Sequence, residues 1–176
     1  MKFMLVVGWM AALLVAGCAG PVVRSEVLQH GSGPVSTLSF KAERFEFEGT
    51  GTGNTALNAT WNPVMSHFGN VLVRTLSDSF PKRLAEQGVE LAEAGPETSR
   101  LVIQPQTYRV MCGGGAGCNA TLVVGGVLIG PGDVRRWTFE SPLAYEGFNQ
   151  QTFDAFEREI IERLVKDGII PGKQAR

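Results

Sequence analysis

The chain has 176 residues, a length that suits one domain with a substantial core. Hydrophobic residues make up 44% and charged residues 19%, which is typical of globular rather than disordered proteins. The net charge is −1 and Lys and Arg are scattered singly, so we expect no nucleic-acid-binding surface, which needs a basic surplus on one face.

Residues 1–17 have the layout of a secretory signal peptide. Lys2 precedes an apolar stretch at 3–15, and small residues follow at 16 and 17. An uncleaved membrane anchor is the alternative, because the uncharged stretch between Lys2 and Arg24 is just long enough to span a bilayer. Glycines and a proline near its end favour the signal peptide, since a spanning helix should still be running there.

The four residues Val15-Ala16-Gly17-Cys18 resemble the lipobox of bacterial lipoproteins. This resemblance implies cleavage before Cys18, a diacylglycerol on its sulfur and a third acyl chain, such as palmitate, on its freed amine. With Ala19 rather than Asp next, it also implies the outer membrane, with the domain facing the periplasm. Several acyl chains, each contributing about 0.8 kcal/mol per buried CH₂, form a stable anchor. The alternative is an ordinary cysteine near the end of a cleaved signal.

Residues 18–35 read as the lipidated cysteine and a flexible tether, because Gly, Pro and Ser interrupt every periodic pattern. A flexible coil of this length reaches roughly 20–25 Å. We therefore expect the domain to sit clear of the lipid headgroups.

A single domain is expected over residues 36–170. Residues 36–48 alternate like a strand whose apolar parity switches, which predicts a bulge near Glu43 or Arg44. The glycine-rich residues 49–60 predict a loop. A helix is then expected from about Asn62 to a cap at Gly88, with a kink or restart at Pro81.

Three strands are predicted next, over 100–112, 119–130 and 134–145. Pro105 indicates an edge or a bulge in the first strand. The turn residues at 130–133 predict a hairpin between the last two. An amphipathic helix follows over about 149–167, and residues 171–176 are expected to form a disordered tail.

These elements predict an α+β fold in the order β-α-β-β-β-α. Two amphipathic helices on one face of a mostly antiparallel, four-stranded sheet would make a two-layer sandwich. This architecture is similar to that of small α/β outer-membrane lipoproteins that serve as accessory subunits of envelope machines. The similarity concerns architecture alone.

The stretch MCGGGAGCNA, residues 111–120, holds two of the three cysteines. With Cys18 assigned to lipid, Cys112 and Cys118 make an even pair in an oxidising compartment, at the facing ends of two predicted strands. A redox C-x-x-C motif does not fit the spacing, and a phosphate-binding loop would need a lysine and a following helix. We therefore predict a Cys112–Cys118 disulfide.

No catalytic residue, cofactor or metal site is predicted. The chain has two histidines, and only two cysteines remain as metal ligands once Cys18 is set aside. The acidic pair Glu46 and Glu48 is expected to be a solvated strand face. Gly125 and Gly126 interrupt an apolar strand, and two explanations stay open: a surface that a partner strand or ligand approaches closely, or room for helix side chains in the core.

The sequence predicts a non-enzymatic, membrane-anchored lipoprotein that binds or supports an unidentified partner in the cell envelope. One alternative is a carrier of an apolar or envelope-derived small ligand, held between helices and sheet. Another is a periplasmic hydrolase that uses an acidic pair.

Overall fold

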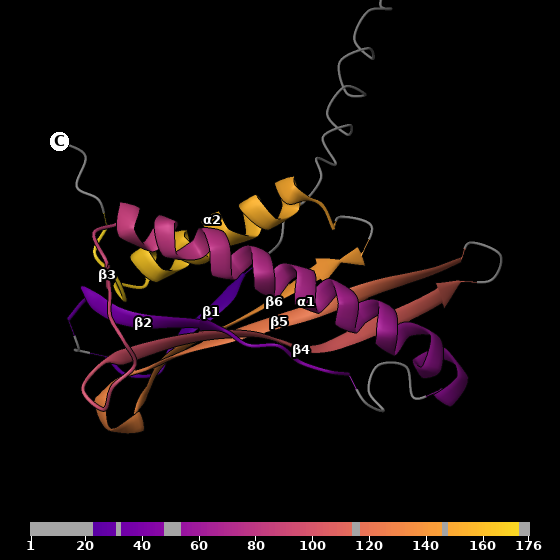
Figure 1. The fold of residues 1–176 in the computed structure, drawn as a ribbon, viewed down its shortest axis with the longest axis horizontal. Helices are drawn as coiled ribbons and strands as arrows, with labels where there is room; N and C mark the ends of the chain where they lie inside the picture. The colour runs from indigo at the N-terminus through magenta and orange to yellow at the C-terminus, as the bar shows by residue number, and fades with distance from the viewer. Residues whose placement is uncertain (1–22, 31–32, 48–53, 114–116, 146–147, 173–176) are drawn as a thin grey trace, which may run out of the picture.

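The computed structural model describes residues 23–30, 33–47, 54–113, 117–145 and 148–172. They form an α+β fold in which two helices, α1 (Thr55–Glu86) and α2 (Gln150–Lys166), lie on one side of a six-stranded sheet (Figure 1). The predicted class and the placement of both helices on one face are therefore confirmed. The signal peptide, Cys18 and residues 173–176 of the expected tail lie outside the described residues.

The sheet is larger than predicted and mixed in direction. Its strands run in the order β1-β6-β5-β4-β2-β3, antiparallel from β1 to β4 and parallel from β4 to β3. The strands are β1 (Arg24–Val27), β2 (Thr37–Ala42), β3 (Glu90–Leu91), β4 (Ser99–Gly113), β5 (Gly117–Ile129) and β6 (Arg135–Ala144). The prediction of four mostly antiparallel strands was wrong because β1 and β3 are short, and because α1 crosses over between β2 and β4, which makes that pair parallel.

Strand β1 lies inside the segment that we expected to be a flexible tether. Arg24 pairs with Glu140, and Val27 pairs with Trp137 of β6. Val23, immediately before the strand, is only 1% exposed. The folded domain therefore begins at residue 23 rather than at 36, and the expected tether over 18–35 is corrected to at most the residues before Val23.

The predicted bulge near Glu43 is replaced by the end of strand β2 at Ala42. The Glu43 amide still donates to the Ile103 carbonyl at 2.8 Å, after which the chain leaves the sheet. Phe47 turns into the core and its ring meets that of Tyr108 at 5.2 Å between centroids. The switch in the apolar alternation after Ala42 thus marks the point where the chain leaves the sheet, and not a bulge within a strand.

Helix α1 begins earlier than predicted. Asn54 caps it by accepting hydrogen bonds from the amides of Ala56 and Leu57, at 3.0 and 3.3 Å. Residues 55–60 of the expected loop are therefore helical, while residues 49–53 lie outside the described part. The helix also continues past Pro81 to Glu86 without a restart.

The core fills the space between the helices and the sheet. Its largest fully buried side chains come from both layers: Trp137, Tyr108, Phe80, Phe156, Leu38, Met65, Leu72 and Leu76. Trp137 donates its indole N–H to Asp167 at 2.7 Å, and the hydroxyl of Ser25 donates to the same carboxylate at 2.6 Å. Asp167 therefore ties β6 and the short strand β1 to the end of α2.

An ion pair joins the two helices. Glu157 of α2 is fully buried and accepts a hydrogen bond from Arg83 Nε of α1 at 2.5 Å. Ser79 also donates to this carboxylate, and Asp154 lies 3.3 Å from the guanidinium. The hydrogen bond to Glu157 raises the pKa of Arg83 above its ordinary value. Ser79 and Arg83 of α1 thus bind Glu157 of α2, and these contacts hold the two helices against each other.

Strands β4 and β5 extend beyond their neighbours as a two-stranded arm. Strand β2 pairs with β4 only as far as Ile103, and β6 pairs with β5 only as far as Thr121. A bulge between Pro105 and Thr107 confirms the expectation for Pro105. The helix-side face of the arm lies against α1, where Tyr108 donates to Asn62, and burial raises the pKa of the Tyr108 phenol.

The hairpin predicted from the turn residues at 130–133 is also confirmed. A short 3-10 turn, Pro131–Asp133, connects β5 to β6, which pair antiparallel. Asp133 lies 2.5 Å from the guanidinium of Arg100 on β4. The hairpin therefore places β6 on one side of β5, with β4 on the other side of β5.

Candidate functional site on the helix-free sheet face

Within the described part of the chain, no helix covers the second face of the sheet (Figure 1). Side chains alternate between the faces along each strand. On β5, Leu122, Val124 and Leu128 point into the core, while Val123 and Val127 face the other way. The helix-free face therefore receives the alternate residues of β1, β4, β5 and β6.

One row of this face crosses four strands and has a glycine inside it. Gln104 of β4 pairs with Gly125 of β5, which pairs with Glu140 of β6, which pairs with Arg24 of β1. Because Gly125 has no side chain, its polar neighbours border a hollow. Residues that face each other across strands point to the same side, so the amide, carboxylate and guanidinium groups share this face.

Gln106 borders the same hollow because of the bulge in β4. The register shift leaves Gln106 without a partner on β5, between Pro105 and Thr107. On the helix side, Pro105 approaches Gly69 of α1 so closely that a Cβ on that glycine would lie 3.1 Å from the proline ring. On the other side, the amide of Gln106 lies over Gly125, where any Cβ would collide with it. The bulge thus redirects one polar side chain into the hollow.

The hollow has a volume of about 510 Å³. Charged residues at its border come from β1 and β6: Arg24, Glu26, Arg135 and Glu140. None of these four makes an ion pair with another residue in the described ranges. Thr138 and the two glutamines add uncharged hydrogen-bonding groups. The pocket can therefore accept and donate hydrogen bonds with groups that the fold does not use elsewhere.

The two glycines that the sequence singled out have opposite surroundings. Gly125 faces the hollow, whereas a Cβ on Gly126 would collide with the ring of Phe139, on the helix-covered face. Of the two explanations left open, the close-approach surface stays a prediction at Gly125, where the group that approaches closely is the amide of the chain's own Gln106. The core explanation fits Gly126, although the room is for a neighbouring strand's aromatic ring rather than for a helix side chain.

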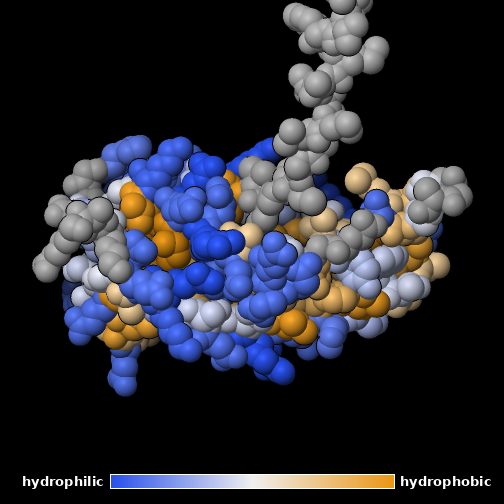
Figure 2. All heavy atoms as spheres, turned by 90° about the horizontal axis from the view of Figure 1, so that it is seen from above, coloured by the Kyte–Doolittle hydropathy of each residue, from blue (hydrophilic) through white to orange (hydrophobic). Residues whose placement is uncertain are grey.

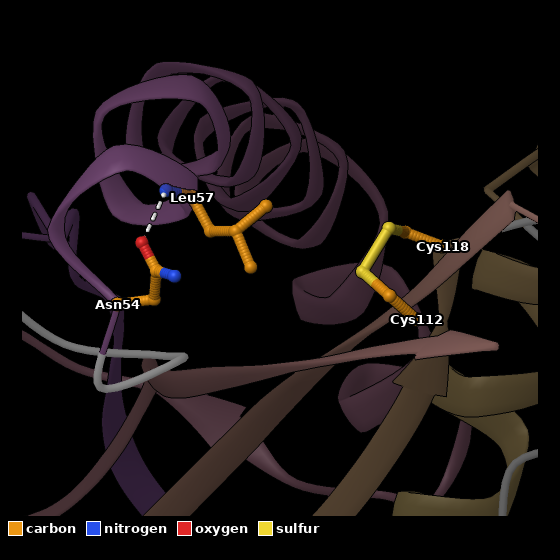
Figure 3. Close-up of a disulfide and its surroundings, with 4 residues drawn as sticks. All are labelled: Asn54, Leu57, Cys112 and Cys118. Atoms are coloured by element: carbon orange, nitrogen blue, oxygen red, sulfur yellow. Dashed lines mark hydrogen bonds between the residues drawn. A yellow bond between two sulfur atoms is a disulfide. The ribbon is translucent and has the colours of Figure 1, made fainter. Parts of the chain in front are cut away.

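Cys112 and Cys118 lie at the end of the arm, away from this hollow. They are directly paired residues of β4 and β5, and a disulfide joins them across a Cα–Cα distance of 4.0 Å. Figure 3 shows the bond beside the first turn of α1, where Asn54 caps the helix near Leu57. The disulfide therefore closes the end of the arm and contributes no group to the hollow.

The acidic side chains of the described residues form no metal cluster, but two carboxylates, Glu26 and Glu140, border the hollow. Within these residues, no group of three or more His, Cys, Asp and Glu side chains could hold a metal ion. Glu46 is exposed, and Glu48 lies outside the described residues, so the expected pairing of these carboxylates is not visible. No helix among the residues described is long and apolar enough to cross a membrane.

Comparison with known proteins identifies no family. No protein-family model and no curated protein matches the chain. The solved structures similar to it include the PelC dodecamer from Paraburkholderia phytofirmans, with 11% identity, a TM-score of 0.37 and coverage of 80% of this chain and 94% of that chain. A minor lipoprotein from Acinetobacter baumannii has 14% identity, a TM-score of 0.38 and coverage of 82% and 100%. Likeness at this level does not extend to function.

Sequence reasoning missed most residues around the hollow. Arg24 and Glu26 fell in the expected tether, and Gln104 and Gln106 were not singled out within their strand. A signal existed for β1: Arg24 and Glu26 alternate with Val23, Ser25 and Val27, which is the period of a strand. The cross-strand row itself could not be found without the register.

Proposed function

We propose that this protein is a non-enzymatic lipoprotein, anchored in the bacterial outer membrane through Cys18, that binds a partner protein of the cell envelope on the helix-free sheet face. The anchor rests on the lipobox resemblance at residues 15–18, which lie outside the described part of the chain. The binding role rests on the hollow around Gly125.

The observation that carries the binding role is the row Gln104–Gly125–Glu140–Arg24. The amide of Gln106 lies over Gly125, so a partner would contact this amide and would reach the Gly125 backbone only when the flexible Gln106 side chain moves aside. The unpaired carboxylates and guanidinium groups at the border would supply charge-assisted hydrogen bonds, which are the strong ones. A polar loop of a partner protein therefore fits this surface.

A small polar ligand derived from the envelope is the second candidate for the same hollow. Its volume, about 510 Å³, lies within the range of small-molecule sites. By contrast, an apolar ligand held between the helices and the sheet is not supported, because large buried side chains such as Trp137, Phe80 and Phe156 fill that space. The carrier alternative thus moves from the core to the open face.

A photocrosslinking amino acid placed at Thr138 tests the binding role in intact cells. Thr138 lines the hollow, whereas Asp78 lies exposed on α1 and serves as the matched control position. We expect a discrete protein adduct from Thr138 and not from Asp78. Gly125→Val fills the hollow and should abolish the adduct. An adduct that survives Gly125→Val, or equal adducts from both positions, would refute the assignment of this face.

The small-ligand candidate has its own readout. Native mass spectrometry of the purified chain should show a bound mass that Gly125→Val removes, without a protein adduct at Thr138.

The anchor is tested separately with a fatty-acid probe: the wild type should be labelled and Cys18→Ser should not. Equal labelling of the two would overturn the lipoprotein assignment.

A further inference from the structure

The folded domain lies close to the proposed anchor. Val23 is buried and β1 begins at Arg24, so only four residues separate Cys18 from the domain. Even fully extended, this connection spans about 17 Å. The domain therefore cannot stand clear of the membrane that holds the acyl chains, in contrast to what a long tether would allow.

The direction of β1 decides which end of the domain faces that membrane. β1 runs antiparallel to β6, with Arg24 opposite Glu140, so the chain arrives from the side toward which β6 runs. Beyond Glu140, β6 continues to Ala144 and is followed by Tyr145. The five residues from Ser141 to Tyr145 span about 17 Å, which equals the reach of the connection. The anchor thus lies at the Tyr145 end of the sheet.

Aromatic side chains gather at this end. The ring of Tyr145 contacts those of Trp61, Phe68 and Phe148, with centroids 5.8, 4.8 and 6.4 Å apart. All four residues are only partly buried. They come from α1, from the end of β6 and from the start of the α2 region; we call them the aromatic cluster. The arm projects from the same end and carries Met111, which is 73% exposed.

Charged side chains are distributed very unevenly along α1. No Asp, Glu, Lys or Arg occurs from Asn54 to Val73, whereas five occur from Arg74 to Glu86. Residues 141–145 and 148–153 are also free of these side chains, and Glu146 between them lies outside the described residues. Figure 2, which views the helix side, shows mostly pale to orange residues toward the arm, and strongly hydrophilic residues together with some orange patches toward the other end.

We infer that the aromatic cluster rests on the membrane leaflet that carries the acyl chains of Cys18. This inference depends on the proposed lipidation. Trp and Tyr favour the level of the lipid headgroups, where an apolar ring and a polar atom are both accommodated. The four residues of the aromatic cluster carry no charge, so their contact is set by aromatic and apolar groups rather than by attraction to anionic lipids. The anchored domain consequently has a fixed end toward the bilayer.

Tryptophan fluorescence of the acylated full-length protein in lipid vesicles tests this orientation. Signal cleavage removes Trp9, which leaves Trp61 in the cluster and Trp137 in the core. Vesicles of phosphatidylethanolamine and phosphatidylglycerol carry a nitroxide quencher at headgroup depth. Because headgroup contact brings Trp61 beside the quencher, we expect the emission of Trp61 to fall by roughly half or more. Trp137 should lose little.

Single-tryptophan variants assign the signal. Trp137→Phe leaves Trp61 alone, and Trp61→Phe leaves Trp137 alone. In case Trp137→Phe does not fold, Lys82→Trp in the Trp61→Phe background places an exposed reporter at the charged end of α1. It should be quenched no more than Trp137, while the wild-type protein supplies the Trp61 signal by difference. Replacing phosphatidylglycerol with neutral phosphatidylcholine should not change the result.

The outcomes separate this inference from the lipoprotein assignment. Absence of acylation at Cys18 and failure to sediment with vesicles would overturn the assignment itself. Acylated, sedimenting protein in which Trp61 is quenched no more than Trp137, or in which Lys82→Trp is quenched equally, would overturn the orientation alone.

Discussion

The two faces of the sheet use the same residue types for different purposes. Gly126 makes room for a core ring, and its neighbour Gly125, one residue earlier, opens a hollow on the outside. Charged residues differ in the same way. Arg83 and Glu157 pair between the helices, whereas Arg24 and Glu140 face each other across β1 and β6 without an ion pair. Groups that the fold already uses stabilise it, and groups that it leaves unpaired are available for binding.

The largest expected effect on the helix side comes from breaking the buried ion pair. Arg83→Met leaves the fully buried carboxylate of Glu157 without its cation. Removing one partner of such a pair is strongly destabilising, and with Arg83 itself 27% exposed we expect a loss of about 3 kcal/mol in the free energy of unfolding. Urea denaturation measures it.

Two control variants sharpen this result. Arg24→Met on the open face should change the free energy of unfolding by no more than about 0.5 kcal/mol. The double variant Arg83→Met, Glu157→Leu removes both charges and should recover much of the loss, because an apolar pair avoids the desolvation of a buried charge. Equal losses from Arg83→Met and Arg24→Met would break the distinction between the two sides.

Removing the disulfide at the end of the arm should give the next largest loss of stability. Replacing Cys112 and Cys118 together by Ala frees a short loop in the unfolded chain, which should cost about 2–2.5 kcal/mol in the chain-entropy model. Because the bond lies at the end of the arm, the adduct from Thr138 should persist. Thiol titration of the unfolded, unreduced mature protein should find no free thiol. Two reactive thiols would contradict the pairing, and a lost adduct would extend the binding surface into the arm.

The neighbouring glycines provide a matched pair of smaller effects. Gly126→Ala forces a methyl group against the Phe139 ring, and overpacking of this kind should cost about 1–2 kcal/mol. Gly125→Ala meets only the end of the flexible Gln106 side chain, which can move toward solvent. We expect it to cost less than about 0.5 kcal/mol. Thermal unfolding of the two variants measures the difference, and a reversed order would mean that the faces are assigned wrongly.

The elements that have a long, uninterrupted hydrophobic pattern could be predicted from the sequence, whereas those that depend on pairing between strands were missed. The stripe of α2, the three long strands and the turn at 130–133 were found because each has an uninterrupted local pattern. Strand β1 was missed because Gly and Pro surround a short alternation, although Val23 and Ser25 face the core side. The start of α1 was missed because the glycines at 49–53 led us to predict a loop as far as residue 60, and only the cap at Asn54 reveals the helix. Gly125 was selected from sequence, but its neighbours Gln104 and Glu140 follow from register alone.

The smallest expected effect concerns the open-face pair Arg24 and Glu140. Opposite charges directly across two strands contribute roughly 0.2–1 kcal/mol when they interact, and exposed pairs lie at the low end of that range. Both residues are exposed, and no ion pair joins them. A double-mutant cycle with Arg24→Gln and Glu140→Gln should therefore give a coupling energy below about 0.5 kcal/mol. Each single variant should nevertheless weaken the Thr138 adduct, because the charge lost belongs to the hollow. Strong coupling in stability, with an unchanged adduct, would mean that these charges hold β1 in place and are not available to a partner.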